Sequence, residues 1–268
     1  MAHFLIAAAI AAASVAPAPA PSLPDADPAI WVVNDADTVI YLFGTFHALD
    51  GKSDWFNDEV ETAFSASDEL VLETVVPHGP HSPPIKAFSL PTRRIPNLGV
   101  TPSASFLAST RLAISAGQAR GMKVDNGADM VLRRAAEALG KPVAGLETFD
   151  FQLGMFRRMP SQPAQAVGPS QDLSSAGNLA IVMGQMQAAW NRGESGIFAT
   201  MLDQMRSNSP ASYDVMFTQR NSNWAAWIAQ RLQQPGTVFV AVGTGHLAGP
   251  DSVQAKLAQL GVRSSRIN

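Results

Sequence analysis

The chain has 268 residues, of which 46% are hydrophobic, and its formal net charge is −3 at pH 7. This length and apolar content suffice for one sizeable core, and the small net charge offers no basic face for nucleic acid. Cysteine is absent, which excludes disulfides, thiolate metal sites and a cysteine nucleophile.

The N-terminus has the pattern of a secretory signal peptide. A short apolar run at residues 4–13 precedes small residues at A-x-A spacing, Ala18 and Ala20. The run is shorter than the roughly 20 apolar residues that a spanning helix needs. We therefore expect residues 1–20 to be a signal peptide, residues 21–28 a Pro-rich linker, and the product to be periplasmic or extracellular with no membrane span. No Lys or Arg precedes the apolar run, so a loosely docked N-terminal arm is the alternative.

Residues 29–268 alternate predicted strands with predicted helices. Short runs of β-branched and aromatic residues between turn formers predict the strands, and apolar residues at helical spacing predict the helices. Residues 85–125 contain several prolines and glycines and predict short helices with irregular joins. The predicted strands are 29–33, 38–43, 69–76, 142–146, 237–242 and 262–267; the predicted helices are 55–65, 129–139, 252–260 and a stretch over 149–232 that is broken by a loop at 160–175.

This alternation predicts the fold class. Strands that alternate with helices form α/β sheets, so we expect a central mixed sheet flanked by helices. The long helical stretch lies between two strands in the sequence. It therefore predicts an inserted helical lobe over about 149–233, within a single domain that spans 29–268.

Two short patterns each occur twice. Gly44-Thr45-Phe46-His47 recurs as Gly243-Thr244-Gly245-His246, and a Leu-Glu-Thr triplet occurs at 72–74 and again at 146–148. All four segments follow a buried strand at its carboxyl end. Because ligands of open α/β sheets bind outside the carboxyl ends of the strands, we expect the two histidines and two glutamates to share one crevice.

These residue types suit two kinds of chemistry. Histidine and carboxylate side chains are the ligands for divalent metals in a protein without cysteine, and a His/Glu pair also suits metal-free acid–base catalysis. The glycines at 44 and 243 allow a tight turn and a close approach to a cofactor. The alternative for each histidine is a hydrogen-bonded structural residue, and Glu73 and Glu147 would then be salt-bridged to helices.

Four further residues are candidates for the site or for a structural role. Arg220 lies in a helix with a core-facing stripe that includes Trp224, so it either tethers this helix to Glu147 or faces the cleft and binds a substrate carboxylate or an oxyanion. Asp129 lies at a helix start, where it serves as a cap or belongs to the site. His78 and His81 lie in a Pro-rich loop, where we expect solvated side chains.

The motifs together resemble the TraB/GumN family, which is related to the Tiki-type proteases. The resemblance rests on W-V-V-N-D-A-D-T-V-I-Y-L-F-G-T-F-H, L-V-L-E, G-L-E-T, Arg220-Asn221 before Trp224, and V-F-V-A-V-G-T-G-H-L-A-G-P-D, and it runs from about residue 29 to the end. It implies an α/β fold with paired GxxH motifs and a metal-dependent hydrolytic activity. Some branches of the family have an acidic residue where this chain has Gln219.

Carried onto this chain, the resemblance places the GxxH histidines at His47 and His246 and the acidic positions at Glu73 and Glu147. The leading hypothesis is a metal-dependent hydrolase that acts on peptide bonds, with Mn, Co or Zn held by the histidines and by one or both glutamates. Glu73, Glu147 and Arg220 are its candidate catalytic residues. The alternatives are a metal-free His/Glu esterase and a non-catalytic exported protein that binds a peptide or haem. The expected partner is a peptide or small-molecule substrate.

Overall fold

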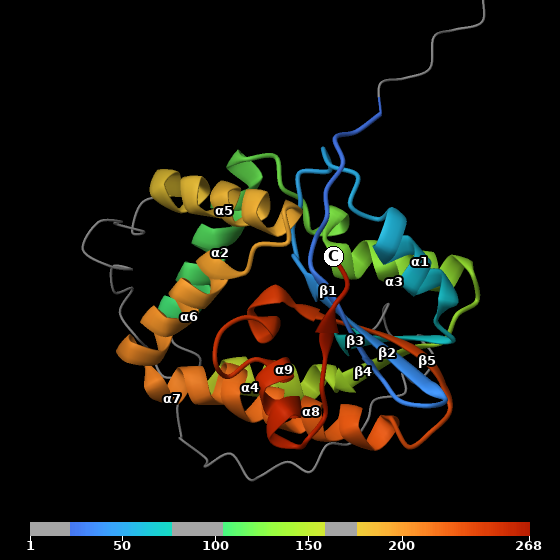
Figure 1. The fold of residues 1–268 in the computed structure, drawn as a ribbon. Helices are drawn as coiled ribbons and strands as arrows, with labels where there is room; N and C mark the ends of the chain where they lie inside the picture. Colours follow the sequence, from blue (N-terminus) through green and yellow to red (C-terminus); the bar gives the residue numbers. More distant parts are fainter. Residues whose placement is uncertain (1–21, 77–103, 159–175) are drawn as a thin grey trace, which may run out of the picture.

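A mixed sheet forms the centre of the molecule (Figure 1). The computed structural model describes residues 22–76, 104–158 and 176–268. Within them, the six strands of the sheet lie in the order β4-β3-β5-β2-β1-β6, in which β2, β3, β4 and β5 run parallel and β1 and β6 pair antiparallel. The strands are β1 (Ile30–Asn34), β2 (Thr38–Thr45), β3 (Glu69–Thr74), β4 (Val143–Glu147), β5 (Gly236–Gly243) and β6 (Ser265–Arg266).

Helices surround this sheet and extend past one end of it. They are α1 (Asp58–Ala66), α2 (Ala104–Ala119), α3 (Ala128–Ala138), α4 (Phe149–Arg158), α5 (Ala176–Asn191), α6 (Gly196–Asn208), α7 (Pro210–Tyr213), α8 (Gln219–Arg231) and α9 (Val253–Gln259). A π-helical turn at Asp214–Thr218 leads into α8, and a 3₁₀ turn at Thr244–Leu247 follows β5.

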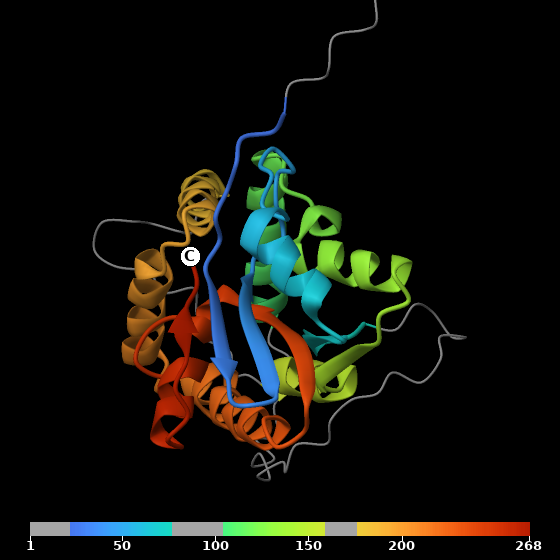
Figure 2. The ribbon, with the colours of Figure 1, turned by 45° about the vertical axis from the view of Figure 1, so that its right-hand side comes forward.

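Both faces of the sheet are buried under helices. Successive residues of β5 point to opposite faces, so alternate residues of this strand pack in two different clusters. Phe239 packs with Phe43 and Phe64, whose ring centroids each lie 5.7 Å away, in the cluster that includes residues of α1 and α3. Val240 belongs to the other cluster, with Trp224 and residues of α8 and α9. Figures 1 and 2 show these two pairs of helices on opposite faces of the sheet. The four parallel strands are therefore apolar through their middle and close to their carboxyl ends.

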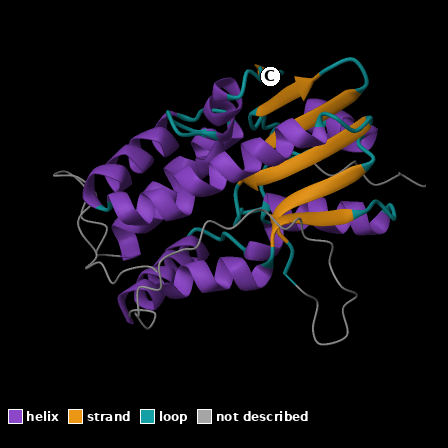
Figure 3. Cartoon of the chain, turned by 90° about the horizontal axis from the view of Figure 1, so that it is seen from below, coloured by secondary structure: helices purple, strands orange, loops and turns teal. Residues whose placement is uncertain are grey.

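The helices α2, α5 and α6 form a lobe beyond the carboxyl ends of the parallel strands (Figure 3). Trp190 of α5 is buried and donates a hydrogen bond from its indole Nε1 to the carbonyl of Gly44, over 2.7 Å. This bond fixes the lobe against the end of β2. The predicted fold class, a central mixed sheet flanked by helices, is confirmed. The lobe differs from the one predicted over about 149–233, because it includes α2, which precedes that range, whereas α8 packs against the sheet.

Three predicted elements differ from the structure. The short helices predicted over 85–125 are wrong within the described part, where α2 is one helix of 16 residues; the last proline before it is Pro102. The strand predicted at 262–267 has only two residues, Ser265 and Arg266. The helix predicted from Trp55 begins at Asp58, since Trp55 instead stacks on Phe43 at 5.7 Å.

Some predictions lie outside the described residues. They include the signal peptide at 1–20, the loop at 160–175, and His78 and His81. Among the helices that the structure does describe, none combines the length and the apolar composition needed to cross a membrane.

Candidate active site

The repeated motifs meet at one edge of the sheet, as predicted. In the parallel pair β2 and β5, Thr45 lies opposite Gly243, and in the parallel pair β3 and β4, Thr74 lies opposite Glu147. Because β3 also pairs with β5, all four strands end side by side. The polar residues that follow the apolar strands are thereby collected in one place, which is where α/β proteins bind ligands.

Gly243 is the point on which three of the predicted side chains converge. A Cβ atom placed on it would lie 3.2 Å from His47 Nε2, 3.6 Å from Glu73 Oε2 and 3.7 Å from His246 Cδ2. The φ angle of Gly243 is −52°, which any residue can adopt, so the space, and not the backbone conformation, favours glycine here. Gly44 has a different role: a Cβ on it would lie 2.9 Å from Thr244 Oγ1, so its small size lets the two turns pack together.

His47 is the exposed member of this group. Its side chain is 62% exposed, and its Nδ1 lies 3.3 Å from Asp129 Oδ1, a hydrogen bond from α3 that leaves Nε2 free to face Gly243. Desolvation lowers the pKa of His47, but the hydrogen bond and charge of Asp129 and the charge of Glu73 outweigh it and raise the pKa to about 9. This pKa favours the protonated imidazole at neutral pH.

Glu73 is held in place through one of its two oxygens. Oε1 accepts hydrogen bonds from Arg220 Nη2 and, over 2.8 Å, from Gln152 Nε2 of α4. Oε2 has only a long contact of 3.4 Å with the backbone N–H of Gly243. Desolvation acts to raise the pKa of Glu73, but Arg220 and the two histidines hold it well below its usual range. Glu73 is thus ionised, with one oxygen available.

Glu147 and Arg220 form a buried pair beneath Glu73. Arg220 donates from Nε and Nη2 to the two oxygens of Glu147, each over 2.8 Å, and Trp224 Nε1 donates to Glu147 Oε1 over 3.1 Å. Burial raises the pKa of Glu147 despite the opposing effect of Arg220, whose own pKa is raised above its usual value by the two glutamates against the effect of burial. Both oxygens of Glu147 are already bonded, so its contacts do not support the predicted ligand or general-base role.

His246 is buried and fully oriented. Its Nδ1 lies 2.6 Å from Asn221 Oδ1, and the amide nitrogen of Asn221 donates to the carbonyl of Asp251 over 2.7 Å, which fixes the amide so that it accepts from the imidazole. The proton is therefore on Nδ1, and Nε2 accepts from Arg220 Nη1 over 3.2 Å. Burial, together with Arg220, lowers the pKa of His246 to about 3, so the ring is neutral.

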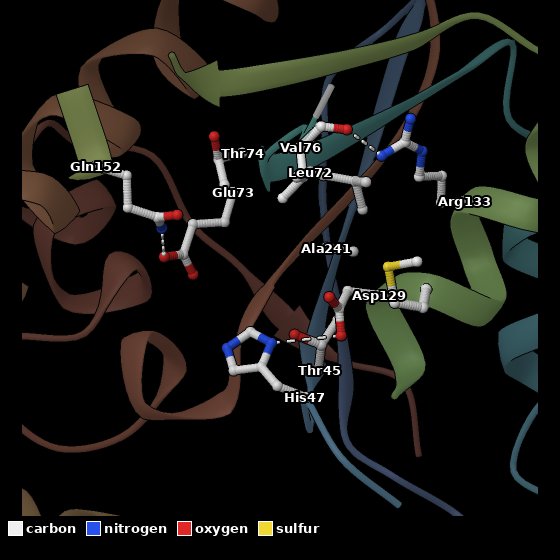
Figure 4. A pocket seen from close by; sticks show the side chains of 11 residues that line it. Thr45, His47, Leu72, Glu73, Thr74, Val76, Asp129, Arg133, Gln152 and Ala241 are labelled. Carbon is white, nitrogen blue, oxygen red and sulfur yellow. Dashed lines mark hydrogen bonds and ion pairs between the residues drawn. The ribbon is translucent and has the colours of Figure 1, made fainter. Parts of the chain in front are cut away.

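A pocket of about 280 Å³ opens beside these residues (Figure 4). His47, Glu73 and Asp129 line it, whereas His246 lies behind Glu73, 3.9 Å from Glu73 Oε2. Figure 4 shows Glu73 with Gln152 on one side of the pocket, and His47 with Asp129 on another. The remaining lining residues are Thr45, Leu72, Thr74, Val76, Met130, Arg133 and Ala241.

The structure adds residues that were not singled out from the sequence. Gln152 fixes Glu73 and Asn221 fixes His246, while Arg133 lines the pocket. The pattern indicated one of them in advance, because Asn221 belongs to the Arg-Asn pair of the family resemblance. Gln152 and Arg133 lie on ordinary amphipathic helices, and nothing in their local sequence distinguishes them from surface residues.

Fold and site define the class: an α/β protein with a centre of histidines, glutamates and an arginine at the carboxyl ends of its parallel strands. The chain belongs to the TraB/PrgY/gumN family, whose model matches residues 29–89 and 87–266. It is similar to YbaP of Escherichia coli (strain K12) and to YbaP of Shigella flexneri, each 29% identical over 168 residues that cover 60% of this chain and 60% of the relative. The match thus spans less than two thirds of those proteins. No solved structure matches the chain.

Proposed function

We propose that this protein is a hydrolase that acts on peptide bonds, with its centre at His47, Glu73 and His246. The observation behind the proposal is the convergence of these three side chains on Gly243 beside an open pocket. The fold does not require such a cluster, because the His47 side chain is exposed and Glu73 Oε2 has only a long contact with the backbone N–H of Gly243. Polar groups that are oriented in this way at a strand edge suit catalysis.

We further propose that a divalent ion, Mn, Co or Zn, is held by His47 Nε2 and Glu73 Oε2. Two features of the site fit such an ion. The missing Cβ of Gly243 leaves a space between these two donor atoms, and a ligating histidine commonly donates its other ring N–H to a carboxylate, as His47 does to Asp129. If bound there, the ion would supply Lewis-acid polarisation of a carbonyl group and a lower pKa for a water molecule.

The surrounding residues hold the two donors in position. Arg220 and Gln152 fix Glu73 through its other oxygen, and Arg220 in turn is fixed by Glu147. His246 would become a third ligand only by giving up its hydrogen bond with Arg220. Within residues 22–76, 104–158 and 176–268, no three His, Asp or Glu side chains form a metal-binding group as they stand.

A metal-free hydrolase is the second candidate, and the position of Arg220 favours it. Its guanidinium already provides a positive charge between Glu73 and Glu147, where a cation would otherwise be needed. In this alternative the His47–Asp129 pair acts directly as the proton donor. Glu73 Oε2 takes a proton from water, and the water oxygen attacks the carbonyl carbon. The carbon–nitrogen bond then breaks as His47 protonates the departing amine, and the proton held by Glu73 returns to His47 through solvent.

Metal binding and peptide cleavage, measured together, test both candidates. Metal-free protein is titrated with Mn²⁺, Co²⁺ and Zn²⁺ by calorimetry, and a library of internally quenched peptides is screened. We expect one ion per chain, a loss of at least 10-fold in affinity for His47→Ala and Glu73→Gln, and a loss of at least about 10²-fold in cleavage. The matched control is His81→Ala, a histidine outside the described residues, which should change neither quantity.

The possible results separate the candidates. Cleavage that persists in chelator and still needs His47 establishes the metal-free candidate. Metal binding that His81→Ala removes, and His47→Ala does not, assigns the ion to the Pro-rich loop and contradicts the proposed centre. If the protein neither binds an ion nor cleaves any peptide in the library, the proposed function is wrong.

A further inference from the structure

A second cation faces the same pocket as the proposed centre. Arg133 of α3 lines the pocket, yet its side chain is only 6% exposed. Its Nε donates to Glu137 over 2.8 Å and its Nη1 donates to the carbonyl of Val76 over 2.6 Å. Within the described part of the chain, no hydrogen bond involves its Nη2. A buried guanidinium is thus held in a fixed orientation with part of its donor capacity unused.

The two acidic side chains that line the pocket are paired with residues other than Arg133. Glu73 is paired with Arg220, and Asp129 accepts from His47. Glu137, the carboxylate that does pair with Arg133, is 45% exposed, so solvent screens that ion pair. The planar fork of arginine matches the two oxygens of a carboxylate, which is the ligand chemistry that this arrangement favours.

Helix geometry sets the spacing between Arg133 and the proposed centre. Arg133 is four residues after Asp129 on α3, so the two lie on the same helix face, one turn or about 6 Å apart along the axis. Asp129, at one end of this spacing, contacts His47, and Arg133 lies at the other end. An extended peptide spans about 3.3–3.6 Å per residue, and one or two residues would therefore bridge the two groups.

Part of the pocket wall is apolar. It is formed by Leu72, Val76, Met130 and Ala241, and Figure 4 shows Leu72 and Val76 between Glu73 and Arg133. A thioether such as that of Met130 adapts to side chains of different shape. This wall suits an aliphatic side chain that lies next to a negatively charged group.

From these observations we propose that Arg133 binds the free C-terminal carboxylate of a peptide whose last residue is apolar, and that the bond hydrolysed lies one or two residues before that carboxylate. The substrate class rests on the proposed hydrolase function. The carboxylate site itself rests only on Arg133 and the wall of the pocket, so binding tests it independently of turnover.

The test compares two ligands that differ only at the carboxyl end. The probes are N-acetyl-alanyl-leucine and its C-terminal amide, titrated into chelator-treated protein and followed by NMR chemical shifts. We expect the acid to bind at least 10-fold more tightly than the amide. In Arg133→Met, which keeps the aliphatic stem, this ratio should fall to about one. The matched control is Arg134→Met, because Arg134 is exposed on the same helix and donates to the carbonyl of Asp125; it should keep the wild-type ratio.

Each possible result supports or overturns the proposed carboxylate site at Arg133. Equal affinity of wild type for acid and amide overturns the proposal, and this comparison stands even if Arg133→Met fails to fold. An equal loss of preference in Arg134→Met and Arg133→Met also overturns it, since the effect would then be one of net charge. Cleavage assays with the same pair separate this inference from the proposed function. Equally fast cleavage of amidated peptides refutes the role of Arg133 and leaves the hydrolase intact, whereas a preference for the acid without any turnover supports Arg133 and refutes the hydrolase.

Discussion

At the scale of single residues, Gly243 shows how little space separates the groups of the centre. The nearest atoms to its missing side chain are the ends of His47 and Glu73, whereas the missing side chain of Gly44 faces backbone and side-chain atoms of Thr244. The two glycines of the repeated motif therefore have different consequences when they are replaced. One lies next to the proposed chemistry, and the other lies between two turns.

We predict that Gly243→Ala impairs function more than stability. The added methyl group would force the exposed His47 ring away by a few tenths of an ångström, which is enough to disturb a two-donor metal site. We expect metal affinity to fall at least 10-fold while the free energy of unfolding changes by less than about 1 kcal/mol. Calorimetry and urea unfolding measure the two effects. Gly196→Ala, where nothing lies within 4 Å of the new atom, is the control and should leave metal affinity unchanged.

The titration of His47 gives a second prediction at this scale. Desolvation lowers the pKa of His47, yet this pKa is about 9 because the hydrogen bond and charge of Asp129 raise it. In metal-free Asp129→Asn, the pKa should move down toward the ordinary value of 6.5. NMR titration of the imidazole resonances of both proteins checks this. An unchanged pKa in the variant would show that Asp129 does not control the charge of His47.

At the scale of elements, α8 connects the centre to the core. One face of this helix places Trp224 in the core. Arg220, one turn earlier on the same face, lies between Glu73 and Glu147. The guanidinium also lies over the Trp224 ring, 4.6 Å from its centroid. The helix is thus held to strands β3 and β4 by a buried cation, which combines structural support with orientation of the site.

Removing this cation should be costly. We predict that Arg220→Met destabilises the protein by about 3–5 kcal/mol, because it leaves buried carboxylates without a partner. Adding Glu147→Gln to that variant should recover part of the loss, since one unpaired charge is then absent. Denaturant unfolding measures all three proteins. Arg192→Met, which breaks the exposed pair with Glu194, should leave stability nearly unchanged; an equal loss there would contradict the special role of burial.

The elements also show what could be predicted from the sequence. The five longer strands were predictable because both faces of the sheet are buried, so each contains a short apolar run next to turn residues. The sixth strand was predicted too long, because its two residues are polar and exposed. The tether from Arg220 to Glu147 was one of two alternatives, since helix periodicity places Arg220 near the core without specifying its partner. The contacts of Gln152 and Arg133 depend on how α4 and α3 dock on the strands, which local sequence does not encode. The length of α2 was predicted wrongly because the prolines of 85–125 indicated breaks, whereas the last of them, Pro102, lies before the helix begins at Ala104.

At the scale of the whole molecule, the buried ionisable groups determine how stability depends on pH. Burial and Arg220 lower the pKa of His246 to about 3, against an ordinary value of 6.5. The unfolded chain therefore takes up a proton at His246 below about pH 6.5, whereas the folded chain does so only near pH 3. Glu73 acts in the same direction at lower pH: its depressed pKa stabilises the fold above 4.5, and this contribution is lost as the pH falls further.

We therefore predict that the protein loses stability in two stages on acidification. The first stage begins below about pH 6.5, belongs to His246 and continues to about pH 3, and it should be absent in His246→Gln, which cannot be protonated there. Glu147, whose pKa burial raises above 4.5, acts in the opposite direction in both proteins. The second stage, below 4.5, should remain in that variant because Glu73 is intact. Melting temperatures in chelator from pH 8 to 3 measure both. A wild-type curve that is flat between pH 6.5 and 4.5 would contradict the neutral, buried state of His246.

The order of the strands has a consequence for when the centre can form during folding. β5 is the fifth strand in the sequence, yet it lies between β3 and β2, so it joins two parts of the sheet that are not otherwise paired. Until residues 236–243 are in place, His47 and Glu73 belong to separate strand groups with unpaired edges. Pairings of such long sequence separation form slowly. Assembly of the centre is therefore a late event in folding, and a chain that is still being synthesised cannot bring His47 and Glu73 together until residue 243 has emerged.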